Sequence, residues 1–191
     1  MKNMKNLKNL KNLKFLSAAL IASSLFIGCS KDDDPQPVNE EELITTLTVT
    51  LEPVGSGDTV TLEFKDMDGD GPDSPEITTG NLVSGVTYSG SIVLLNETEE
   101  EPENITEEVE AESDEHQFFY TTTGELDVTT TYDNFDSADN PLGTRFTLVA
   151  GAVSSGTLIF TLRHEPTKPN EGLDDAGGET DISAEFEVSV E

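Results

Sequence analysis

The sequence of 191 residues has one cysteine, two histidines, no tryptophan, and only 10 basic residues against 39 acidic ones. A single cysteine excludes an internal disulfide framework and a cysteine-rich zinc site. Two histidines disfavour a histidine-rich catalytic metal centre. A formal charge of −29 excludes non-specific binding to DNA or RNA, because the phosphates would be repelled, and disfavours adsorption to anionic lipids. The length allows one ordinary domain or two very small ones.

Residues 1–28 have the pattern of a targeting signal. Five lysines precede a 13-residue apolar run over residues 15–27, which is too short to span a bilayer and has the length of a signal-peptide core. The run ends at Gly28-Cys29, and a small residue before a cysteine resembles the bacterial lipoprotein signal. The resemblance implies cleavage before Cys29 and its lipidation, which anchors the protein to a membrane. The alternatives are a transmembrane anchor and a chance cysteine in a secreted protein.

Residues 29–42 are predicted to be an acidic, extended tether with two prolines. Loss of the signal leaves five basic and 39 acidic residues, a formal charge of −34. Lys31 followed by Asp32-Asp33-Asp34 resembles the export signal of Bacteroidota surface lipoproteins, which implies the outer face of the outer membrane. The leaflet facing the periplasm is the alternative, because any lipoprotein can use a charged tether.

From Leu43 to Glu191 the apolar residues recur with a period of two, which predicts one all-β domain. In the last segment the even positions from Ile182 to Val190 face one way, and the odd positions, beginning with Asp181, face the other. Such alternation produces strands with one buried and one solvated face, hence antiparallel sheets. Recurring turn signals divide the segment into eight or nine strands, and we predict an antiparallel, immunoglobulin-like β-sandwich.

One segment resembles the corner of fibronectin type III and immunoglobulin-like domains. Leu82, Gly85 and Tyr88 have the spacing of that corner at the start of a strand. The resemblance implies that the Tyr88 hydroxyl bonds back to the corner backbone. The alternative is an exposed tyrosine that binds a partner.

Residues 114–119, 162–166 and 177–181 resemble a family of small flavobacterial lipoproteins, sometimes labelled with a type 1 periplasmic-binding fold. That α/β fold needs long helices between its strands, whereas this sequence predicts strands almost throughout. We therefore do not expect its ligand-binding function.

Residues 66–76 contain the main candidate metal site. Asp66, Asp68 and Asp70 stand at every second position before Gly71, as in the first half of a calcium-binding EF-hand loop. Asp73 and Glu76 follow as late ligands, although Ile77 stands where an EF-hand has its glutamate. We predict a structural Ca²⁺ ion here, and the alternative is a solvated acidic turn.

The histidines supply a secondary metal candidate, because His116, His164 and Glu165 are ligands that zinc accepts. Nothing in the sequence brings the two histidines together, so the alternative is that each is hydrogen-bonded elsewhere in the fold or lies at the surface. Directly before His116, residues 97–115 hold 11 acidic residues, and residues 104–113 are predicted to be an acidic loop or a short helix.

The chain has no G-x-S-x-G, H-E-x-x-H or phosphate-binding glycine loop followed by lysine, so we predict that it is not an enzyme.

The expected function is that of a non-catalytic outer-membrane lipoprotein, a calcium-stabilised binding or structural module on the cell surface. Its partner would be a protein or a glycan, and the high charge favours a monomer. The alternative is a small-ligand carrier with a β-barrel lumen lined by aromatic residues: Phe118, Phe119, Tyr120, Phe146 and Phe160.

Overall fold

The computed structural model describes residues 42–69 and 71–191, and most of their regular structure is β-strand. In chain order the elements are β1 (Thr46–Pro53), β2 (Val60–Lys65), β3 (Glu76–Thr78), β4 (Thr87–Asn96), β5 (Glu103–Asn104), α1 (Ile105–Ala111), β6 (His116–Gly124), β7 (Val128–Tyr132), β8 (Arg145–Ala150), β9 (Ser154–His164), α2 (Leu173–Ala176) and β10 (Glu179–Val190).

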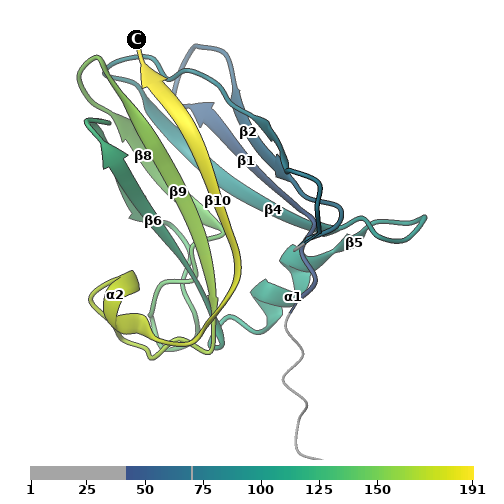
Figure 1. The fold of residues 1–191 in the computed structure, drawn as a ribbon. Helices are drawn as coiled ribbons and strands as arrows, with labels where there is room; N and C mark the ends of the chain where they lie inside the picture. The colour runs from purple at the N-terminus through teal and green to yellow at the C-terminus, as the bar shows by residue number, and fades with distance from the viewer. Residues whose placement is uncertain (1–41, 70) are drawn as a thin grey trace, which may run out of the picture. The chain divides into compact units, whose positions relative to one another are not determined.

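The strands form two antiparallel sheets around one core (Figure 1). The larger sheet has the order β3-β2-β1-β4-β8-β7, with β5 paired to β4, and the smaller sheet has the order β10-β9-β6. Leu47 and Leu94 of the larger sheet belong to the same buried cluster as Phe160 and Phe186 of the smaller one. The predicted antiparallel β-sandwich is confirmed. The strands beyond the predicted number are very short, since β3 has three residues and β5 has two.

The described strands do not close into a barrel. The barrel architecture that the carrier alternative expected is therefore wrong. Three of its proposed lining residues instead pack on one another. Ring centroids are 4.7 Å apart between Tyr120 and Phe146, and 5.7 Å apart between Phe146 and Phe160. Aromatic rings at such separations stabilise a packed core, and here they fill the space between the sheets.

Strand β10 follows the predicted alternation except at its start. Ile182 to Val190 bury every second side chain, but the prediction that Asp181 faces solvent is wrong. The register between β9 and β10 shifts between Thr180 and Ile182. Asp181 is therefore the additional residue of a β-bulge, and a bulge interrupts the alternation of side chains. As a result, the Asp181 side chain is fully buried.

The predicted tyrosine corner is confirmed. The Val83 N–H donates a hydrogen bond of 2.9 Å to the Tyr88 hydroxyl, and Tyr88 is buried. The residue therefore fixes the turn into β4, and its role is structural rather than that of an exposed binding residue.

Part of the acidic segment is the short helix α1, which is one of the two predicted alternatives. Ile105 and Val109, one turn apart, are buried against the core, whereas the preceding residues 98–102 form an exposed loop. Figure 1 shows α1 and α2 near one end of the sandwich and the C-terminus at the other. Among residues 42–69 and 71–191, no helix has the length and apolar character needed to cross a membrane.

Candidate metal centre

The structure brings the two histidines together. His116 is the first residue of β6 and His164 is the last residue of β9, and the two are direct cross-strand partners. Side chains at such positions on one face of a sheet are close neighbours. Their ring centroids lie 4.6 Å apart, so the structure places the two histidines of the secondary metal candidate side by side.

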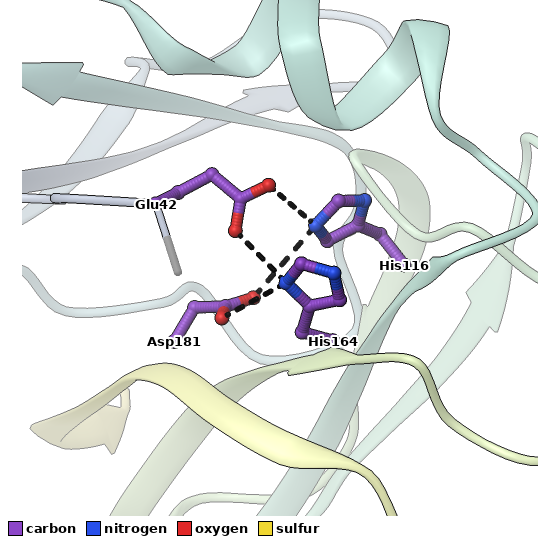
Figure 2. A group of neighbouring side chains, drawn as sticks. All are labelled: Glu42, His116, His164 and Asp181. Carbon is purple, nitrogen blue, oxygen red and sulfur yellow. Dashed lines mark hydrogen bonds and ion pairs between the residues drawn. The ribbon is translucent and has the colours of Figure 1, made fainter. Parts of the chain in front are cut away.

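Glu42 and Asp181 complete a group of four side chains, which we call the His–carboxylate cluster (Figure 2). The two Glu42 oxygens lie 2.9 Å from His116 Nε2 and 3.2 Å from His164 Nδ1. The Asp181 oxygens approach the same nitrogens at 3.9 Å and 3.6 Å, respectively. One ligand atom from each residue can be chosen so that all four lie within 4.8 Å of one another.

These separations fit the coordination shell of a tetrahedral zinc ion. Metal–ligand distances of about 2.0–2.2 Å give a tetrahedron with edges of roughly 3.3–3.6 Å. The four nitrogen–oxygen separations, each to a different carboxylate oxygen, run from 2.9 to 3.9 Å and lie near that range. Small side-chain adjustments would therefore place two nitrogens and two oxygens around one ion.

The cluster is buried. The side chains of His116 and Asp181 are 0 % exposed, that of His164 is 4 % exposed and that of Glu42 is 7 % exposed. Two carboxylates in such a site need compensating positive charge, because burial of an unpaired charge is costly. A divalent cation held by the four side chains would supply it. Imidazole nitrogen favours zinc and other transition metals over calcium, which prefers oxygen ligands.

The outer partner of His116 has the arrangement found around metal-ligating histidines. His116 Nδ1 lies 3.2 Å from the carbonyl oxygen of Glu112. A carbonyl oxygen only accepts, so Nδ1 carries the proton in this bond, and Nε2 is left facing the two carboxylates, where a metal ion would be held. The residue after α1 thus orients the first ligand of the cluster.

Lys168 holds the backbone around His116. Its ammonium donates hydrogen bonds of 2.6 Å to the His116 carbonyl and 2.7 Å to the Ser113 carbonyl, and it lies 3.4 Å from Asp136 Oδ2. Burial lowers the pKa of Lys168, although Asp136 opposes that shift. Burial also disfavours the ionised Asp136, but hydrogen bonds from Asn140 and the Ala138 N–H, together with Lys168, lower the pKa of its carboxyl group.

Gly178 makes room for His164. Gly178 has a φ of +70°, and a Cβ atom there would lie 2.2 Å from the His164 carbonyl oxygen. Both the positive φ and the close approach require glycine. The chain can therefore run past the end of β9 and enter β10 just before Asp181.

The secondary prediction did not include Glu42 or Asp181, and the structure places its third residue, Glu165, in a different group. Glu165 is not in the buried cluster; it belongs with Glu115 and His164 to a second group, in which both carboxylates are exposed. Glu42 was assigned to the tether, where it is one of three consecutive glutamates and carries no distinguishing signal. Asp181 was missed because period-two alternation does not reveal a bulge.

The structure does not bring the residues of the calcium prediction into a metal-binding group among its described residues. Asp66 Oδ1 instead accepts the N–H groups of Asp68 and Gly69 at 3.3 and 2.9 Å, and Asp68 Oδ2 accepts the Asp73 N–H at 3.2 Å. Glu76 is exposed on β3, and Asp70 lies outside the described residues. Calcium binding at residues 66–76 thus stays a prediction from the sequence.

The predictions for residues 1–41, including lipidation of Cys29, concern residues outside the described part of the chain and stay predictions. No family model, curated protein or solved structure matches the chain.

Proposed function

We propose that this protein is a non-catalytic, zinc-binding β-sandwich module exported as a lipoprotein. The observation that carries the proposal is the convergence of Glu42, His116, His164 and Asp181 in one buried group. Three of the ligands come from the ends of strands in the smaller sheet, so the sandwich itself sets their positions.

The composition and burial of the cluster support a structural zinc site. Catalytic zinc sites combine three protein ligands with an open position for water or substrate, whereas structural sites are closed by four protein ligands. Here four side chains surround the same point and the most exposed of them is 7 % exposed. An ion held in this way would stabilise the fold and leave no position for a substrate.

The cellular placement in this proposal comes from the sequence. The Gly28-Cys29 signal supports a lipid anchor, and Lys31 with the following aspartates supports display on the outer membrane, where a protein or glycan partner would be met. Protease treatment of intact cells should then remove the domain. A domain that is cleaved only after the cells are lysed would contradict surface display and favour the leaflet facing the periplasm.

Titration of the metal-free, full-length chain with Zn²⁺ tests the proposed site. We expect one tightly bound ion per chain, because the structure supplies one closed set of ligands. His116→Gln and Asp181→Asn should each weaken binding more than about 100-fold, the upper end of the effect of losing an outer-shell partner. Isothermal titration calorimetry with a competing chelator measures both stoichiometry and affinity.

Glu165→Gln is the matched control, because Glu165 follows His164 directly but is exposed and outside the cluster. Its affinity for zinc should equal that of the unaltered chain. Zinc binding that is unaffected by His116→Gln would contradict the proposal. A parallel titration with Ca²⁺, using Asp68→Ala, tests the independent proposal of a calcium site at residues 66–76.

A further inference from the structure

Residues 42–44, which we call the strap, bring one ligand to the cluster from outside the smaller sheet. Glu42 precedes β1, which lies between β2 and β4 in the larger sheet. The other three ligands belong to β6, β9 and β10 of the smaller sheet. An ion in the cluster would therefore connect the start of the described chain to the end of the smaller sheet.

The three ligands of the smaller sheet are fixed by the strands that carry them. His116 and His164 are paired across β6 and β9, and the bulge between Thr180 and Ile182 fixes the direction of Asp181. These positions depend on backbone ladders that exist without an ion. The smaller sheet thus provides a three-ligand half-site.

Glu42 is attached more loosely. In the part of the chain that the structure describes, main-chain hydrogen bonds begin at Thr45, whose N–H donates to the Leu95 carbonyl at 2.9 Å. Leu43 is 57 % exposed, and Ile44 is only partly buried against the core. The Glu42 carboxylate, with its contacts at 2.9 and 3.2 Å to the histidines, is therefore the main polar attachment of the strap.

The strap carries the most exposed ligand of the cluster. His116 and Asp181 are fully buried, and Glu42 has the most exposed side chain of the four. An ion that reaches the buried nitrogens must displace one of the ligands, and the ligand on the short, weakly bonded segment moves most easily. Opening of the strap requires no strand of either sheet to separate.

We infer that the strap opens to admit the metal ion and that the bound ion then fastens it through Glu42 to the smaller sheet. This inference rests on the proposed zinc site and adds its regulation: zinc occupancy sets how firmly residues 42–44 are docked. Coupling between two such events is reciprocal, so a docked strap also raises the affinity for zinc.

Cleavage by a glutamate-specific protease tests the inference, because a docked Glu42 side chain is held in the cluster and withheld from the protease. The full-length chain is digested in the zinc-loaded and chelator-treated states, and cleavage between Glu42 and Leu43 is timed by mass spectrometry. We expect zinc to slow this cleavage about 5–150-fold, the usual range of coupling between two sites. Asp181→Asn, which leaves Glu42 intact, should lose the protection.

Cleavage in the exposed loop at Glu99–Glu101 supplies the internal control for direct effects of zinc on the protease. If calorimetry shows one zinc per chain but cleavage after Glu42 is equally fast with and without zinc, the strap inference is overturned and the proposed zinc site stands. If no zinc binds, the proposed function fails and the inference fails with it.

Discussion

Saturating zinc is expected to raise the thermal midpoint of the metal-free, full-length chain by roughly 5–11 °C. An ion at 100 times its dissociation constant stabilises the folded state by about 2.7 kcal/mol, provided that it binds only that state. For a chain of this size each kcal/mol shifts the midpoint by about 2–4 °C. The zinc ion would add this stability by joining Glu42 of the strap to three strands of the smaller sheet.

The variants identify where this stabilisation arises. Asp181→Asn and His116→Gln should abolish the zinc-dependent rise, whereas Glu165→Gln should retain it. Melts in calcium and in magnesium, read by circular dichroism, complete the series: a calcium-specific rise lost in Asp68→Ala would establish the Asp66 loop as a second site. Equal midpoints with zinc and with chelator would show that the cluster is a set of ion pairs without a metal.

Replacement of Lys168 by methionine is expected to lower the free energy of unfolding by about 3–5 kcal/mol, the usual cost of removing one partner of a buried ion pair. The variant leaves the buried Asp136 carboxylate without its cation. It also removes the donor to the carbonyls of Ser113 and His116. Urea unfolding at pH 7 measures the change.

Lys65→Met is the matched control, because Lys65 pairs with Glu97 at 2.7 Å but on a surface open to solvent. Its effect on stability should be much smaller, since exposed ion pairs contribute little. The double variant Lys168→Met with Asp136→Asn should recover part of the loss, because no buried carboxylate remains unpaired. An unchanged urea midpoint for Lys168→Met would show that this buried pair is not a structural element of the site.

The fold could be predicted from the sequence because its signals are local. Alternating apolar residues, as in β10 from Ile182 to Val190, identify strands with one buried face without knowledge of their partners. The Leu82–Tyr88 corner is similarly contained in seven residues, and the predicted hydrogen bond between the Tyr88 hydroxyl and the corner backbone is confirmed. Helix α1 was only one of two alternatives, since many acidic residues weaken the helical signal given by Ile105 and Val109.

The site was less predictable because it depends on strand pairing and on a break in periodicity. His116 and His164 are 48 positions apart in the sequence, and only the β6–β9 register makes them neighbours. Asp181 depends on a bulge that the pattern of residues does not announce. The one available signal was that residues 114–119, 162–166 and 177–181, singled out for a family resemblance, each contain one member of the cluster.

The acidity of the chain makes the identity of the ligands the central question. With 39 carboxylate side chains, zinc could associate with surface carboxylates by charge alone, and a stoichiometry by itself would not show which atoms hold the ion. Nitrogen ligation separates the two cases, because His116 and His164 are the only histidines of the chain. A surface-bound ion would have an oxygen-only shell.

X-ray absorption at the zinc edge, on the full-length chain loaded with one equivalent of zinc, is therefore the most direct test. The proposed site predicts four nitrogen and oxygen ligands at about 2.0–2.2 Å, with outer-shell scattering from two imidazole rings. His116→Gln should lose one ring from that signal or lose the ion. A shell of oxygen atoms without imidazole scattering, unchanged by His116→Gln, would contradict the proposed zinc site.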